Sequence, residues 1–279
     1  MTARTASATA LALLAFAGNA LLCRMALGEG LIDAASFTTI RVISGAVMLL
    51  IIMLPRWRSQ RRAPTNWWTV TMLYTYMVFF SFGYVSLDAG TGAVIGFAAV
   101  QLTMFAAALR RGERFSLAAW CGLATAAAGV IYLLLPGIST PDPVGALWMT
   151  IAGIGWGVYS IIGSAGHDSG EATANNFIGA IPLAIAVQLF FLDNSNLTNA
   201  GVTLAIISGA ITSGLGYILW YTAIRELRVS TAATVQLSVP IIIAAGGALL
   251  LDEAITLRLL IAAIVTLGGI AIVLRARKV

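Results

Sequence analysis

Charged residues are scarce in this sequence of 279 residues: Asp, Glu, Lys and Arg make up 10% of it, whereas 59% is apolar. A soluble globular domain carries about a quarter charged residues. The few charges are spaced so that ten long stretches contain none, namely 5–23, 42–55, 63–87, 89–109, 115–141, 143–166, 172–192, 194–224, 229–251 and 259–274. This distribution excludes a secreted disulfide-bonded protein, a nucleic-acid-binding protein and a soluble enzyme.

Cysteine and histidine are also rare. Cys23 and Cys121 both fall in apolar runs, so no disulfide framework is indicated. The single histidine, His167, lies in a polar connection, and a zinc or haem site is therefore not expected. We expect no cofactor. No small-residue cleavage site follows the first apolar run, which we interpret as a retained membrane span.

The charge-free stretches have the length of membrane spans. A bilayer core about 30 Å thick needs roughly 20 apolar residues in a helix. Only helices or closed barrels satisfy their backbone polar groups in lipid, and strand-period alternation is absent. We predict an all-α membrane protein with ten transmembrane helices at about 6–27, 34–54, 67–87, 90–109, 116–135, 143–163, 172–192, 201–224, 230–250 and 257–274.

Basic residues gather at alternate ends of these spans. Because basic loops stay in the cytoplasm, an N-terminus inside places 13 of the 16 basic residues there: Arg4, Arg56, Arg58, Arg61, Arg62, Arg110, Arg111, Arg114, Arg225, Arg228, Arg275, Arg277 and Lys278. Seven of the 11 acids fall opposite: Glu29, Asp33, Asp88, Asp142, Asp193, Asp252 and Glu253. The pattern predicts a multi-pass membrane protein with both termini in the cytoplasm.

The sequence repeats internally at an offset of 140 residues. This offset superposes the turn 112–116, Gly-Glu-Arg-Phe-Ser, on the turn 252–256, Asp-Glu-Ala-Ile-Thr. Two arginines precede the first turn and two leucines precede the second, which places the turns on opposite sides of the membrane. We predict two inverted five-helix repeats, 1–139 and 140–279. Inverted repeats are typical of transporters, whose substrate site lies near the midplane between the halves.

Several motifs carry a resemblance to a known family. They are the two Glu-containing turns, Pro240 placed 13 residues before Glu253, the Trp156-Gly157 pair and Arg41. The chain resembles the drug/metabolite transporter superfamily, in the branch built from two tandem EamA-type repeats. In size and aromatic content it is most like the bacterial aromatic amino acid exporters of the YddG type, and this resemblance implies a place in a bacterial inner (plasma) membrane.

The sequence also departs from the pattern of that family. Val100 stands where the first repeat usually has a proline, and Ala17-Gly18-Asn19 stands where Trp-Gly is preferred. The resemblance implies that Arg41 is structural, since the family has an arginine there whatever its cargo. Glu113 and Glu253 precede helix starts, where a carboxylate favours the positive end of the helix dipole, and we interpret them as structural acids.

Candidate substrate-binding residues come from polar and aromatic side chains within the spans. Buried amides are costly in lipid, although interhelical hydrogen bonds explain them equally well. Tyr and Trp often anchor spans at the interface instead. Pro240 frees the carbonyl of Gln236, which a substrate ammonium group could use. The predicted set is Asn19, Tyr74, Phe79, Tyr84, Phe97, Gln101, Trp156, Tyr159, Tyr217, Trp220, Gln236 and Pro240.

The spans lack acidic residues near their middles, which bears on the cargo. Exchange of an organic cation for a proton needs a carboxylate in the pathway. Anionic cargo needs several buried basic groups, and Arg41 alone is available. We therefore predict a carrier, not an enzyme, that exports neutral or zwitterionic metabolites, amino acids above all, by alternating access. The alternatives are a drug-efflux carrier of the same fold, a membrane-embedded enzyme and a channel-like bundle.

The predicted partners follow from this function. They are a small amino acid-like substrate and membrane lipids, with no nucleic acid. The sequence leaves the oligomeric state open and is compatible with a monomer.

Overall fold

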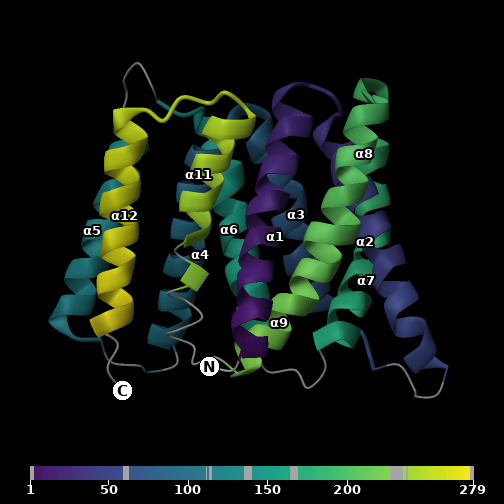
Figure 1. The fold of residues 1–279 in the computed structure, drawn as a ribbon, viewed down its shortest axis with the longest axis horizontal. Helices are drawn as coiled ribbons and strands as arrows, with labels where there is room; N and C mark the ends of the chain where they lie inside the picture. The colour runs from purple at the N-terminus through teal and green to yellow at the C-terminus, as the bar shows by residue number, and fades with distance from the viewer. Residues whose placement is uncertain are drawn as a thin grey trace.

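The computed structural model describes residues 3–58, 63–110, 112, 115–134, 140–163, 169–226, 235–236 and 238–276, which form a helix bundle (Figure 1). The elements are α1 (Ala3–Gly28), α2 (Ala34–Trp57), α3 (Trp67–Ser86), α4 (Ala89–Arg110), α5 (Leu117–Leu134), α6 (Pro143–Gly163), α7 (Ser169–Phe190), η1 (Leu192–Asn194), α8 (Asn199–Ile207), η2 (Ser208–Leu215), α9 (Gly216–Glu226), α11 (Ser238–Leu250) and α12 (Leu257–Ala276). Over these ranges no strand occurs, and one isolated β-bridge joins Ile32 to Leu197.

The all-helical prediction is confirmed for the described residues, and most helix ends lie within three residues of the predicted span ends. The predicted start of the ninth span, at residue 230, lies outside the described residues. By length and composition, six segments of the described chain could cross a membrane: Thr5–Gly28, Ala34–Trp57, Ala89–Arg110, Pro143–Ile162, Gly170–Phe190 and Asn199–Ala223. The described parts of α5, α11 and α12 are apolar but shorter, and α3 is rich in Tyr and Trp. The crossing of the membrane by these four helices therefore stays a prediction. The connection around His167 and the turn residue Glu113 lie outside the described residues.

The α5–α12 contact shows how the two halves are related. At Gly129 an added Cβ would meet Thr266, and at Gly269 it would meet Ala126. Ala126 and Thr266 are 140 positions apart, as are Gly129 and Gly269, so each half makes the same contact to the other. Reciprocal contacts of this kind are what a twofold relation between two similar surfaces produces.

Other helix pairs follow the same relation. α2 packs on α7 and α4 on α11, each pair joining helices at corresponding places in the two halves. The α3–α6 contact has its counterpart in α1–α9, and α4–α6 has its counterpart in α1–α11. The helices around the centre of the bundle therefore come from both halves.

The halves run in opposite directions. Arg24, near the end of α1, donates a hydrogen bond to the carbonyl of Tyr84 at 3.3 Å, and Asp142, at the start of α6, accepts one from Ser86 at 2.9 Å. The end of α1 and the start of α6 thus lie together at the end of α3. The backbone N–H of Gly145 and the Ser86 hydroxyl lower the pKa of Asp142 by stabilising its carboxylate. The first turn of α1 and the last turn of α12 lie at the opposite end of the bundle (Figure 1).

A π-helical segment, η2, interrupts the predicted eighth span. It packs on α2 so closely at Gly209 that a Cβ there would collide with the backbone carbonyl of Arg41 and the Ser44 hydroxyl. Gly45, on the other side of this contact, lies against the Phe177 ring and the Gly209 carbonyl. π-helical turns are rare and are found frequently at functional sites. This one lies beside the central cavity described next.

Candidate substrate-binding site

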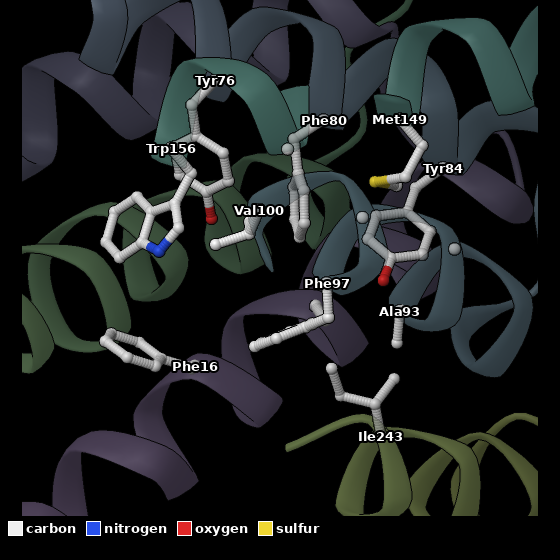
Figure 2. Close-up of a pocket in the computed structure, with 14 residues that line it drawn as sticks. Phe16, Tyr76, Phe80, Tyr84, Ala93, Phe97, Val100, Met149, Trp156 and Ile243 are labelled. Carbon is white, nitrogen blue, oxygen red and sulfur yellow. The ribbon is translucent and has the colours of Figure 1, made fainter. Parts of the chain in front are cut away.

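A cavity with an empty volume of about 500 Å³ lies at the centre of the bundle. Its walls come from α1, α3 and α4 of the first half and from α6 and α11 of the second. Figure 2 shows the larger lining side chains pointing toward one another across it. The lining residues are Phe16, Ala20, Tyr76, Phe80, Tyr84, Gly92, Ala93, Gly96, Phe97, Val100, Met149, Gly153, Trp156 and Ile243.

Aromatic rings form one wall of the cavity. Tyr76, Phe80 and Tyr84 recur every four residues along α3, which places them on one helix face. The Tyr76 and Phe80 ring centroids are 5.1 Å apart, and those of Phe80 and Tyr84 are 4.7 Å apart. Trp156 continues the wall at 4.9 Å from Tyr76 and lies 5.7 Å from Phe16. These distances are those of favourable aromatic pairs.

Small residues in α4 and α6 leave space for the cavity. Gly92 and Gly96 are one turn apart on α4, and neither adds a side chain to the space beside Met149. Gly153 of α6 faces the Gly96 carbonyl so closely that a Cβ there would lie 2.5 Å from the oxygen. Ala93, on the same part of α4, points into the cavity (Figure 2). Close approach of α4 and α6 through glycines therefore fixes the shape of the site.

A polar network lies beside the aromatic wall. The Oδ1 atom of Asn19 in α1 accepts hydrogen bonds from three hydroxyls of η2: Ser208 at 2.8 Å, Ser213 at 3.3 Å and Thr212 at 3.4 Å. Its Nδ2 atom contacts the hydroxyl of Tyr76, a cavity residue, at 3.5 Å. The π-helical turn brings these hydroxyls to one amide, and the network ends at the cavity.

Arg41 belongs to the same network and is fully buried. Its Nε donates to the Ser213 hydroxyl at 3.0 Å, and its Nη2 donates to the hydroxyls of Tyr217 at 3.2 Å and Tyr76 at 3.4 Å. The guanidinium carbon lies 5.5 Å from the Tyr76 ring centroid and 5.6 Å from that of Phe80. Arg41 therefore does not extend to the membrane surface but lies directly behind two cavity rings.

The two halves of the sequence each match one family model. Residues 4–135 and 143–275 match the model described as the EamA-like transporter family. The chain belongs to this family. It is thus a membrane transporter of the drug/metabolite transporter superfamily, as the motifs in its sequence indicated.

Relatives of this EamA-family transporter span most of its length. An uncharacterized protein of Pseudomonas aeruginosa is 46% identical over 98% of this chain and 96% of its own. An uncharacterized transporter of Archaeoglobus fulgidus is 26% identical over 72% of this chain and 74% of its own. The uncharacterized transporter YoaV of Bacillus subtilis is 20% identical over 84% and 85%. A crystal structure with 18% identity covers 96% of this chain and 98% of its own at a TM-score of 0.69, which shows that the fold is shared.

In this EamA-family transporter, some of the predicted site residues meet at the cavity and others lie around it. Tyr84, Phe97 and Trp156 line it. Asn19 and Tyr217 lie in the adjoining polar network. Tyr159 and Trp220 form a second layer, with ring centroids 5.6 Å from Trp156 and 5.5 Å from Phe16, respectively.

The remaining predicted residues lie away from the cavity lining. Tyr74 is buried on another face of α3, and Phe79 stacks on Trp148 at 5.1 Å. Gln101, one turn beyond Phe97, is buried, and its Nε2 has no hydrogen-bond partner. Gln236 and Pro240 are buried near the start of α11, whose Ile243 reaches the cavity. A substrate role for these five residues stays a prediction.

The set predicted from the sequence left out Tyr76, Phe80 and Arg41. The four-residue spacing of Tyr76, Phe80 and Tyr84 is the signal that could have selected this face of α3. Arg41 was interpreted as structural because the family has an arginine there. Arg41 is buried beside the cavity, away from the acidic residues of the described chain, because of how the helices pack. This arrangement could not be predicted from the sequence.

An ion-pair cluster lies at the end of the transporter opposite the first turn of α1. Arg24 Nε pairs with Glu253 Oε1 at 2.7 Å, and Arg24 Nη2 pairs with Asp88 Oδ1 at 3.2 Å. Glu253 Oε2 also accepts a hydrogen bond from the backbone N–H of Ala89, at the start of α4, at 2.8 Å. The cluster ties α1 and α4 of the first half to the turn before α12.

Glu253 lies at a helix start, but not at the one that we expected, and its interpretation as a structural acid stays a prediction. It stabilises the start of α4 and not the start of the helix that follows it in sequence. The start of α12 is instead capped by Thr256, whose hydroxyl accepts from the backbone N–H of Leu259 at 3.1 Å. The sharp turn between α11 and α12, where Asp252 has a φ of 52°, directs the carboxylate back toward the first half.

Proposed function

We propose that this transporter exports small amino acid-like metabolites, aromatic and other apolar amino acids above all, from the bacterial cytoplasm by alternating access. The observation that supports the proposal most is the composition of the central cavity. None of its 14 lining residues is charged, and six of them carry aromatic rings: Phe16, Tyr76, Phe80, Tyr84, Phe97 and Trp156. Such a lining suits an apolar or aromatic side chain.

The polar groups beside the cavity support the same cargo. The polar network that reaches the cavity at Tyr76 offers hydrogen bonds to the backbone end of an amino acid. A small zwitterion thus has a place for its side chain and a place for its polar groups.

The position of the cavity between the inverted halves suits alternating access. α1, α3 and α4 line it from one half, and α6 and α11 line it from the other. When two inverted halves rock against each other, a site between them is exposed first on one side of the membrane and then on the other. The Arg24 ion pairs connect the two halves at one end of the bundle, and the halves would separate at that end during this motion.

Counterflow in proteoliposomes tests the proposed function. Vesicles loaded with unlabelled phenylalanine should take up labelled phenylalanine in a saturable, temperature-sensitive manner, with methionine and threonine as competitors. Lysine and glutamate should compete poorly, because their charged side chains would enter the uncharged cavity. Vesicles prepared without the protein provide the background.

The outcomes of the counterflow experiment separate the candidates. Saturable exchange of amino acids supports the proposal. Exchange restricted to lipophilic drug-like compounds would replace it by drug efflux, and non-saturable flux would indicate a channel-like bundle.

A further inference from the structure

We infer that Arg41 is the anion-binding group of the transport site and that it pairs with the carboxylate of the transported molecule. The inference rests on the proposed function and names the chemical class of its substrate: a monocarboxylate with an apolar side chain. No acidic side chain of the described residues balances the charge of Arg41.

Arg41 has no acidic partner. It is fully buried, and the groups that accept its hydrogen bonds are the neutral hydroxyls of Ser213, Tyr217 and Tyr76. The ion pairs found in the described ranges of the chain both belong to Arg24. An isolated charge inside a membrane protein is costly, and charges at such positions usually have a partner or serve substrate binding. An anion brought by the cargo would supply the missing charge.

One nitrogen of the guanidinium has no hydrogen-bond partner. Arg41 Nη1 is buried and unpaired, and the Nη2 bonds to Tyr217 and Tyr76 are long for charged donors, at 3.2 and 3.4 Å. A carboxylate binds an arginine best through two parallel N–H···O bonds. The unpaired Nη1 and the weakly bonded Nη2 form such an edge, whereas Nε is already engaged by Ser213.

The Tyr76 and Phe80 rings lie between the Arg41 guanidinium and the cavity. The guanidinium carbon atom is 5.5 Å from the centroid of Tyr76 and 5.6 Å from that of Phe80, and both rings line the cavity. In the bound state that we propose, the Tyr76 ring turns aside. The substrate carboxylate then replaces the Tyr76 hydroxyl on Nη2, while the apolar side chain stays among Phe16, Phe97 and Trp156.

The arginine is held in place for this role by the packing around it. Gly209 of η2 lies directly against the Arg41 backbone carbonyl, while Ser213 of η2 and Tyr217 of α9 hold the side chain. A single fixed guanidinium suits one carboxylate. None of the residues that line the cavity is basic, so Arg41 alone would neutralise a phosphate or a dicarboxylate incompletely.

The test compares ligands that differ only in their charged groups. Binding to purified wild-type protein in detergent is measured by thermal stabilisation, which follows ligand concentration and affinity. Phenylalanine and 3-phenylpropionate should stabilise the protein. Phenylalaninamide and 2-phenylethylamine, which lack the carboxylate, should bind about 10- to 100-fold more weakly, as expected for loss of a charge-assisted pair.

Variants then connect this preference to Arg41. In Arg41→Gln the preference for acid over amide should disappear, and Arg41→Lys should keep the preference with a higher KM for phenylalanine counterflow. Arg258→Gln is the matched control: Arg258 bonds the Tyr132 carbonyl and Thr140 away from the cavity, and its loss should leave the preference unchanged. If Arg41→Gln does not fold, the comparison of acid and amide binding by the wild-type protein still tests the inference.

The possible results distinguish the inference from the proposed function. Equal binding of acid and amide by the wild type, or an unchanged preference in a folded Arg41→Gln, would overturn the role of Arg41 even if amino acids are exchanged. Carboxylate-dependent stabilisation without any amino acid counterflow would leave Arg41 as an anion site and refute the proposed function.

Discussion

Replacing Ala93 with tryptophan is expected to abolish transport while the helix bundle remains folded. Ala93 lies on α4, is 3% exposed and points into the cavity opposite Ile243 (Figure 2). An indole at this position would extend into the cavity and take up space that a substrate needs. Counterflow of phenylalanine should fall by more than about tenfold, since even a misplacement of about 1 Å can cost 100-fold in a positioned site.

Ala106→Trp provides the matched control for this experiment. Ala106 lies on the same helix but is exposed on the outside of the bundle, where lipid would surround an added indole. This variant should transport at close to the wild-type rate. Size-exclusion elution and the thermal unfolding midpoint should stay similar in both variants. Normal phenylalanine exchange by a folded Ala93→Trp protein would show that the substrate does not pass through the cavity.

Loss of the Arg24 side chain is expected to open the end of the transporter that its ion pairs hold together. Arg24 joins α1 to Asp88 and Glu253, and the side chains of Arg24 and Glu253 are 18% and 12% exposed. Removing one partner from a largely buried pair leaves the other charge uncompensated, at a cost of up to about 3–5 kcal/mol when burial is complete. Since these groups are partly exposed, we expect a smaller shift, of about tenfold in the population of the open state.

A cysteine in the cavity can report this shift. With Cys23 and Cys121 replaced by alanine, Val100→Cys would be labelled by a membrane-impermeant thiol reagent only through an open pathway. Arg24→Gln should raise the rate of labelling from the side of the Arg24 cluster by about tenfold. In a double variant that combines Arg24→Gln with Glu253→Gln, Val100→Cys should be labelled no faster than in the faster-labelled of the two single variants. The reason is that the effects of substitutions within one network are not additive.

Arg258→Gln serves as the control for this prediction as well, since it removes a positive charge near the same turn whose hydrogen bonds to the Tyr132 carbonyl and Thr140 lie outside the Arg24 cluster. Its labelling rate should match that of the parent protein. An Arg24→Gln protein labelled no faster than the parent would show that the ion pairs do not control opening.

The bundle could be predicted from the sequence because charge alone delimits its helices. α6 spans residues 143–163 both in the prediction and in the structure, since Asp142 and a polar connection bound an apolar run. The π-helical segment η2 could not be predicted. Its residues, Ser-Gly-Ala-Ile-Thr-Ser-Gly-Leu, are compatible with an ordinary helix, and its geometry arises where Gly209 packs on α2.

The candidate site was predictable only in part, because α3 carries aromatic residues on every face. Tyr74 and Tyr76 are two positions apart and thus point in directions about 200° apart around a helix. The four-residue spacing of Tyr76, Phe80 and Tyr84 marks one of these faces, but the packing of α3 against α4 and α6 decides that this face lines the cavity. The partner of Glu253 was hidden for a similar reason, since Arg24 is 229 residues away in the sequence.

Protection of Val100→Cys by substrate tests most directly whether the central cavity binds the transported amino acid. In the background without native cysteines, a water-soluble thiol reagent is applied to reconstituted protein with and without phenylalanine. Glu29→Cys, exposed in the turn between α1 and α2, is the control whose labelling should not respond. We predict that phenylalanine slows the labelling of Val100→Cys several-fold, with the concentration dependence of counterflow. Undiminished labelling at saturating phenylalanine, in a variant that still exchanges it, would contradict binding in the cavity.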